Sequence, residues 1–209
     1  LHSLPSARQN LVLRAWLRGL GLPVPSHRTL AAFRHDMLEA ARDRIPTVDW
    51  PGARVYRYRG HLHATVREQE PVTMPQGDWT VGTTFDLGAL GRLELVAANG
   101  VGLRREGLPV VLQVAGRNGG EVFRAAGSAH RRPLRKWLQE RGVLPWRREQ
   151  VPLVCIAGEI AAIGAFAYGG AHAAAPGEPS WRIAWRGRPP LTEVEARELA
   201  EVAGEGPLR

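Results

Sequence analysis

Residues 116–152 read GRNGGEVFRAAGSAHRRPLRKWLQERGVLPWRREQVP, and this stretch decides how the second half of the chain folds. Pro133 suits the first turn of a helix, because its missing N–H would have no partner there. Gly142 suits the left-handed position just after a helix ends. At 100° per residue, one face of this helix is apolar. That face consists of Leu134, Trp137 and Leu138.

Basic side chains gather on the opposite face of this short helix and on both sides of it. The opposite face carries Arg132, Arg135 and Lys136, and the flanking cations are Arg117, Arg124, His130, Arg131, Arg147 and Arg148. Such a helix can dock by its tryptophan side and offer cations to a partner. The alternative is a solvated surface helix, because charge runs are usually solvated faces.

The same stretch resembles the C-terminal domain of the tRNA(Ile)-lysidine synthase family. That family carries a Gly-Gly-Glu turn, a basic helix, a Val-Pro-Pro-Trp turn and an arginine before a Pro-Leu strand. Here these features are Gly119–Glu121, His130–Glu140, Val143–Trp146 and Arg147–Leu153. The departures are small: Arg135 and Trp137 stand where lysine and leucine are common, and Leu144 replaces a proline.

The composition indicates a polyanionic partner. The chain has 209 residues, with 28 Lys and Arg against 20 Asp and Glu, which gives a formal net charge of +8. Such an excess is typical of proteins that bind nucleic acid or an anionic membrane surface. A genome that favours arginine codons is the alternative, since Lys136 is the only lysine. The single cysteine, Cys155, excludes an internal disulfide and fits a reducing cytoplasm. We expect no membrane association, because no apolar run reaches transmembrane length.

Residues 1–66 predict two helices and a hairpin. The first helix is expected at Arg8–Leu20, and the second begins at His27, after the N-cap Ser26, and extends to about Arg44. The expected buried stripes are Leu13, Trp16, Leu17 and Leu20 on the first helix, and Leu30, Phe33, Met37 and Ala41 on the second. The outer face of the second helix carries Arg28, His35 and Arg42, which we interpret as solvated, with RNA contact as the alternative.

The predicted hairpin, ARVYRYRGHLHATVRE, turns near Gly60. Alternation places Arg57 and Arg59 on one side of the first strand. His61 and His63 also share a side, but no third ligand lies nearby, so we predict no metal site. This segment is similar to the middle, substrate-binding domain of the same family. The matching segments are Arg8–Leu17, Gly21–Ser26 and Arg57–Leu62.

A polar segment, Glu68–Asp78, separates the two halves and suits an exposed linker. We predict an α+β protein: a small, mainly helical domain with a β-hairpin at 1–70, a linker at 71–78 and an α+β domain of short strands and one or two helices at 79–187. A tail at 188–209 follows, in which Thr192 and Glu195 can form a capping box for a helix to about Ala203. The expected strands of the second domain are Trp79–Phe85, Arg92–Ala97, Val110–Ala115, Leu153–Ile156, Ile160–Phe166 and Trp181–Trp185.

We expect no catalytic residue and no bound cofactor in this chain. Full-length members of the family bind ATP with a Ser-Gly-Gly-x-Asp-Ser loop in an N-terminal α/β domain, and residues 1–209 do not contain that loop. Gly116–Gly120 does not replace it, because it lacks the phosphate-loop lysine and hydroxyl pair. The resemblance implies that ATP, with magnesium, and lysine are used by a catalytic domain that this chain lacks.

The resemblance implies that this chain is the tRNA-binding and positioning part of an ATP-dependent ligase. The family attaches lysine to the wobble cytidine of isoleucine tRNA to form lysidine, and some members form homodimers. The predicted tRNA-binding residues are Arg57, Arg59, Arg117, Arg124, His130, Arg131, Arg132, Arg135, Lys136, Arg147 and Arg148. The alternatives are a general RNA- or DNA-binding module and a non-binding structural domain; no RRM, KH or helix-turn-helix motif is present.

Overall fold

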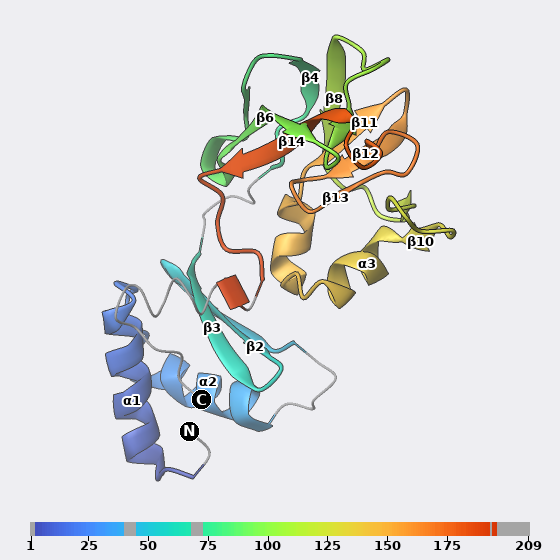
Figure 1. Cartoon of the computed structure of the whole chain (residues 1–209). Coiled ribbons are helices and arrows are strands. Elements are labelled where there is room, and N and C mark those ends of the chain that lie inside the picture. Colours follow the sequence, from blue (N-terminus) through green and yellow to red (C-terminus); the bar gives the residue numbers. More distant parts are fainter. Residues whose placement is uncertain (1–2, 40–44, 68–72, 193, 196–209) are drawn as a thin grey trace. The chain divides into compact units, whose positions relative to one another are not determined.

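The computed structural model describes residues 3–39, 45–67, 73–192, 194 and 195, which belong to two compact units (Figure 1). The first unit lies within Leu1–Pro71 and the second is Val72–Ala196. The protein combines helices with several antiparallel sheets, which is compatible with the predicted α+β class. Each unit has its own hydrophobic core.

The first unit combines two helices with a three-stranded sheet. The elements are α1 (Ser6–Gly19), α2 (His27–Glu39), β1 (Thr47–Trp50), β2 (Ala53–Tyr58) and β3 (His61–Val66), and the strand order is β1-β2-β3. The core contains Leu13, Leu17, Leu30, Phe33, Met37, Trp50, Ala53 and Val55. The predicted apolar stripes of both helices therefore face the core, although Trp16 and Leu20 are only partly buried. The predicted Ala41 lies outside the described residues, and β1 was not expected.

Local interactions define where these elements begin and end. Ser26 is the N-cap of α2, as predicted: its Oγ accepts the N–H of Thr29 at 3.1 Å. The turn between β2 and β3 consists of Arg59 and Gly60, whose φ angles are 49° and 82°. Two successive residues in the left-handed region form the two-residue turn that matches strand twist in a hairpin. The hairpin is thus confirmed, with Tyr58 paired to His61.

The second unit contains two larger antiparallel sheets, whose strand orders are β13-β12-β11-β8-β4 and β5-β6-β14-β7. The strands of the first are β4 (Gly77–Thr80), β8 (Val111–Ala115), β11 (Leu153–Ile156), β12 (Glu159–Ile163) and β13 (Ala167–Tyr168). Those of the second are β5 (Phe85–Asp86), β6 (Arg92–Asn99), β7 (Leu103–Arg104) and β14 (Pro179–Arg186). The remaining elements are η1 (Gly88–Leu90), β9 (Val122–Phe123), β10 (Arg132–Pro133), α3 (Leu134–Glu140) and η2 (Pro145–Gln150).

Both sheets and α3 contribute to one core. Leu112 and Val154 come from the five-stranded sheet, and Leu93 and Ile183 from the four-stranded sheet. The indole N–H of Trp185 donates to the carbonyl of Leu90 at 2.7 Å, so this buried polar atom is satisfied. Gly91 must be glycine: its φ is +88°, and a Cβ there would lie 2.1 Å from the carbonyl oxygen of Arg186.

Two sequence predictions about the start of this unit need correction. The single strand expected at Trp79–Phe85 is interrupted by a turn, in which the N–H of Thr83 donates to the carbonyl of Thr80 at 3.1 Å. The two ends of the segment consequently belong to different sheets. In the segment Glu68–Asp78, which was expected to be exposed, Thr73 and the residues Gln76–Asp78 are exposed, but Met74 is buried in the core. The end of the segment also belongs to β4, where Asp78 pairs with Gln113 of β8. An apolar side chain inside a polar segment can thus anchor it.

The last described residues are tied to the second unit by an arginine–glutamate pair. Arg188 donates through Nη2 to Oε1 of Glu195 at 2.6 Å and through Nη1 to Oε2 at 2.9 Å. Glu195 also accepts the N–H of Thr192 at 3.2 Å, and its own N–H donates to Oγ1 of Thr192 at 3.2 Å. These reciprocal bonds are the predicted capping box. Residues 196–209, where the helix was expected to continue, lie outside the described residues.

The first prediction concerns the core of the second unit. Trp137 is 5% exposed and meets Phe123 edge-on, with ring centroids 6.0 Å apart. Trp137→Ala should lower the free energy of unfolding by about 3–5 kcal/mol, because it leaves a large cavity. The matched control is Val122→Ala in β9, where the side chain is 51% exposed, and its effect should stay within about 0.5 kcal/mol. Urea denaturation measures both, and equal effects would contradict this packing.

The second prediction concerns the pH dependence of stability. Hydrogen bonds from Arg188 lower the pKa of Glu195 to about 2, against the opposing effect of partial burial. A carboxylate whose folded pKa is lowered adds stability that is complete above its unfolded pKa of 4.5 and is lost as the pH falls toward 2. Glu195→Gln should therefore destabilise the protein near neutral pH and do so less near about pH 3.5. Denaturant unfolding at both pH values gives the two differences; a pH-independent difference would exclude the ion pair as its cause.

Candidate nucleic-acid interface

Helix α3 presents cations because its other face is packed into the core. Leu134, Trp137 and Leu138 are buried, as the sequence pattern predicts, whereas Arg135 and Lys136 are exposed. Pro133 was expected in the first turn but occupies the N-cap position, without a capping hydrogen bond, one residue before the helix begins. Gly142 follows the end of the helix with φ +72°, as predicted. Arg135 and Lys136 form no ion pair or hydrogen bond within the described part of the chain. Their charged groups are therefore available to an anionic partner.

Arg132 does not lie on the helix, contrary to the sequence interpretation. It belongs to β10, where it pairs with Phe123 of β9, because Pro133 favours an extended residue before it. Its guanidinium reaches the far end of α3 and donates to Oε2 of Glu140 at 2.6 Å. Both side chains are partly exposed, and an ion pair of that kind contributes only about 0–1 kcal/mol. Arg132 can thus exchange this carboxylate for another anion.

Arg141 is a surface cation that the sequence analysis did not single out. Its Cζ lies 4.7 Å from the centroid of the Trp137 ring. An arginine that stacks on an indole keeps its N–H edge available while its orientation is restricted. The spacing from Trp137 to Arg141 is four residues, which places neighbours on one side of a helix, so the sequence did contain this signal.

Arg117 has an internal role instead of an exposed one. Its side chain is 5% exposed and bridges Glu121 Oε2 at 3.5 Å and Glu149 Oε1 at 3.2 Å. Burial alone would raise the pKa of Glu121, but the N–H groups of Asn118 and Gly119 and the charge of Arg117 outweigh it, and the net pKa is lowered. These interactions stabilise the conformation of the Gly-Gly-Glu turn. Burial of this degree argues against a phosphate contact at Arg117.

Arg147 and Arg148 also support the local fold. Both belong to η2 and are partly exposed. Arg147 donates through Nη1 to Oε1 of Gln150 at 2.7 Å, and Arg148 donates through Nε to the carbonyl of Val143 at 3.1 Å. An arginine has five N–H donors, so each of them can hold the protein and still contact a phosphate.

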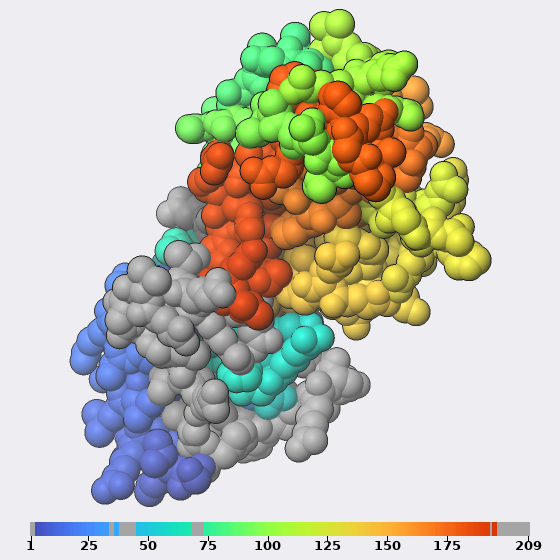
Figure 2. Space-filling view, viewed as in Figure 1, coloured from blue at the N-terminus to red at the C-terminus, as the bar shows by residue number. Residues whose placement is uncertain are grey.

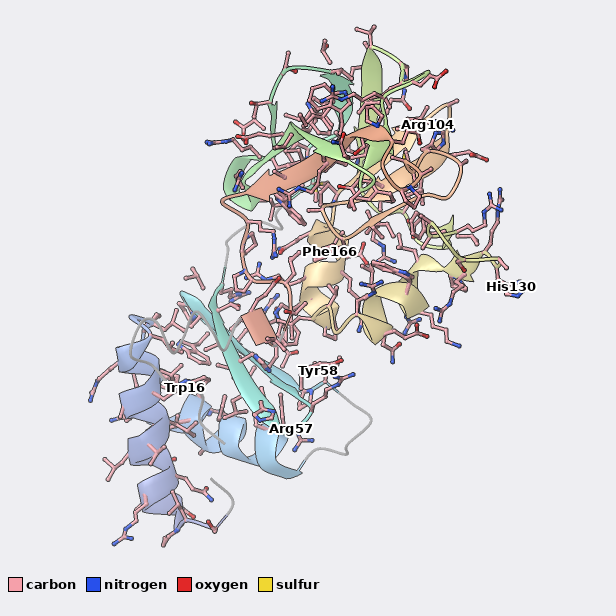
Figure 3. The ribbon with its side chains drawn as sticks, in the orientation of Figure 1. Trp16, Arg57, Tyr58, Arg104, His130 and Phe166 are labelled. Carbon is pink, nitrogen blue, oxygen red and sulfur yellow. The ribbon has the colours of Figure 1, made fainter. Side chains whose placement is uncertain are left out.

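The segment between β9 and β10 carries three exposed basic residues. Arg124, His130 and Arg131 are all exposed, and Figure 3 shows His130 pointing away from the rest of the second unit. The carbonyl of Arg124 accepts the N–H of Gly170 at 3.0 Å, which fixes one end of the segment. Arg131 Nη2 lies 3.7 Å from Oε1 of the exposed Glu159, a distance at which the charge is only weakly offset.

Arg57 and Arg59 belong to the first unit and differ in exposure. Arg57 is partly buried and donates through Nη1 to the carbonyl of Met37 at 2.6 Å, so it joins β2 to α2 (Figure 3). Arg59 is exposed at the hairpin turn, with its Cζ 5.2 Å from the centroid of the Tyr58 ring. Arg59 is therefore the more accessible cation of the pair.

Other kinds of site have little support among the described residues. No group of three His, Cys, Asp or Glu side chains there could hold a metal ion. Burial raises the pKa of the Cys155 thiol, which does not favour a nucleophilic thiolate. None of the described helices is both long enough and apolar enough to cross a membrane.

Comparisons with known proteins identify the family. Two family models match: the TilS substrate binding domain at residues 1–63 and the TilS substrate C-terminal domain at residues 112–185. The tRNA(Ile)-lysidine synthase of Methylococcus capsulatus is 32% identical over 160 residues, which are 75% of this chain and 36% of that protein. That of Ralstonia nicotianae is 34% identical over 197 residues, 88% of this chain and 42% of that protein. The chain thus spans about two fifths of the length of these relatives, and it belongs to the tRNA(Ile)-lysidine synthase family, of which it carries the substrate-binding and substrate C-terminal domains.

Proposed function

We propose that this chain is the part of an ATP-dependent ligase that binds isoleucine tRNA and positions it for the attachment of lysine to the wobble cytidine. The observation that carries the proposal is the arrangement of α3, in which a buried Trp137 anchors a helix whose Arg135 and Lys136 are exposed. Family membership supports tRNA as the substrate. Duplex RNA has a narrow major groove, so proteins hold its stems through phosphates and 2′-hydroxyls.

The proposed contact surface consists of the exposed cations around α3 and the β9–β10 segment. Its members are Arg124, His130, Arg131, Arg132, Arg135 and Lys136, and Arg59 adds a contact from the first unit. Arg57, Arg147 and Arg148 are secondary members, because part of each guanidinium is used by the fold. Arg117 is left out because its side chain is buried.

The remaining parts of the proposal rest on the family. We propose domain limits of 1–70 and 79–187, with a linker at 71–78 that is anchored to the second unit by Met74 and by the pairing of Gly77 and Asp78 with β8, and a tail at 188–209. The two family models lie inside the two domains. A separate catalytic domain would use ATP, magnesium and lysine. The cytoplasm is the expected compartment, and a homodimer, which some family members form, is one assembly open to this chain.

The third prediction tests the α3 surface. Arg135→Ala/Lys136→Ala removes two phosphate contacts, so the slope of log affinity against log salt should shrink by roughly 0.7–0.9 for each. The matched control is Arg8→Ala/Arg18→Ala, which removes two exposed arginines from α1. Binding of isoleucine tRNA, bulk tRNA and duplex DNA is measured over a salt series, with circular dichroism to check folding.

Two outcomes of that experiment would count against the proposal. If the α3 variant binds tRNA with unchanged affinity and an unchanged salt slope, this surface is a solvated face that does not contact tRNA. A chain that binds duplex DNA as tightly as isoleucine tRNA would favour the general nucleic-acid-binding module instead.

The fourth prediction concerns activity. The purified chain, supplied with ATP, lysine and isoleucine tRNA, should release no AMP above background, because residues 1–209 contain no Ser-Gly-Gly-x-Asp-Ser loop to hold the ATP phosphates. A chromatographic assay of AMP measures this, and a full-length tRNA(Ile)-lysidine synthase serves as the positive control. Turnover by the chain alone would refute the assignment of all chemistry to a separate domain.

A further inference from the structure

The four-stranded sheet β5-β6-β14-β7 carries arginines on its outer face. Leu93, Ile183 and Trp185 belong to the core, so the residues that alternate with them face outward. Figure 2 shows green and red-orange residues of this region at the surface of the second unit. The register pairs Arg92 with Arg186, Glu94 with Ala184, Val96 with Arg182, and Arg104 with Ser180. All four arginines are exposed.

One pair in this sheet is locally unfavourable. Arg92 and Arg186 stand directly opposite each other, and like charges in that position destabilise a sheet. Their side chains are 60% and 59% exposed. Glu94 is the one carboxylate that both contact within the described residues: its oxygens lie 2.8 Å from Nε of Arg92 and 3.7 Å from Nε of Arg186. Asp86 stands opposite Arg92 on β5, so the outer face as a whole carries four arginines against two carboxylates and keeps an excess of positive charge. A like-charge pair of this kind is a local conflict, and such conflicts are typical of functional sites.

The remaining outward residues extend this charge over a surface of small side chains. Arg182 is four residues from Arg186 on β14, which places the two roughly 13 Å apart on one face. Between the arginines lie Val96, Ala98 and Ala184, all partly exposed. Ser180, which pairs with Arg104, is buried, and its Oγ donates to the carbonyl of Val101 at 2.9 Å. The surface of small side chains is therefore open around Arg182 and Arg186. Asp86, at the edge of this face, accepts the N–H of Gly88 at 2.8 Å.

We propose that this outer sheet face is a second phosphate-binding surface for RNA. Arg92 and Arg186 contact phosphates of one part of the RNA backbone, and Arg182 and Arg104 contact phosphates of another. This inference rests on the proposed function, because the RNA is the same tRNA that α3 contacts. An RNA backbone fits better than a small anion, since the arginines are spread along β14 and over three strands instead of converging on one point. Arginine is suited to this contact because its planar fork pairs with phosphate through two N–H groups.

The experiment compares Arg182→Gln/Arg186→Gln with the α1 control Arg8→Gln/Arg18→Gln. Both variants lose two positive charges, so the net charge of the chain falls by the same amount. The sheet variant should reduce the salt slope of tRNA binding by roughly 0.7–0.9 for each lost phosphate contact, and the control should not. The sheet variant should also unfold at no lower denaturant concentration than the unmodified chain, because Arg186→Gln removes a like-charge pair. Equal slopes for the sheet variant and the unmodified chain would overturn the inference.

Glu94→Gln tests the same inference through a change that should strengthen tRNA binding instead of weakening it. It releases both guanidiniums from their shared carboxylate, so tRNA should bind tighter by roughly two- to fivefold, the range that corresponds to exposed ion-pair energies. The same change should lower stability, because the repulsion between Arg92 and Arg186 is no longer offset. A purely structural Glu94 would lower stability and leave the affinity unchanged, and that result would also count against the inference.

The two proposals fail in different ways. If the unmodified chain does not bind tRNA, the proposed function itself is wrong. The other case is that the unmodified chain binds tRNA, the α3 variant has a smaller salt slope and the sheet variant has an unchanged one. The proposed function is then supported, and only the second phosphate-binding surface is excluded.

Discussion

The packing of Trp137 is the interaction on which the candidate interface depends. Helix α3 has seven residues, and an isolated helix of that length is not stable in water. It exists because Leu134, Trp137 and Leu138 are buried, and the edge-on contact with Phe123 ties it to β9. The exposed positions of Arg135 and Lys136 follow from that anchoring. The cations are thus held by apolar burial, an interaction that salt does not weaken as it weakens the phosphate contacts.

Arginine serves two purposes in this protein, and the net charge of +8 does not distinguish them. Arg117 is buried between two glutamates, and Arg188 holds Glu195 while it lies 5.7 Å from the centroid of the Trp185 ring. These residues stabilise turns and the last described segment. Arg135, Arg131 and Arg182 are exposed instead. A net charge thus overstates the binding surface, because the buried and paired arginines contribute to the fold.

The second unit presents its exposed cations on two kinds of scaffold. In α3 the cations lie on a helix beside an irregular arm, whereas on β6 and β14 they lie on a regular sheet whose register sets their spacing. A sheet face holds side chains at positions set by strand pairing, whereas the segment between β9 and β10 is held by turn and bridge hydrogen bonds, such as the one from the N–H of Ala126 to the carbonyl of Tyr168. The proposed tRNA ligand is large, and its backbone offers many phosphates, so contacts from both scaffolds suit the proposed positioning role.

The sequence by itself determined most elements and the family. The spacing of Leu134, Trp137 and Leu138 predicted the buried face of α3, Ser26 predicted the start of α2, and Thr192 with Glu195 predicted the capping box, because each of these signals involves neighbouring residues. Only the tertiary structure decided which cations are free. Arg117 is adjacent to a turn in the sequence, yet it is buried and pairs with Glu149, 32 residues away. Arg92 and Arg186 are brought opposite each other only by strand pairing. Contacts between distant residues depend on sheet register and packing, which no local pattern specifies.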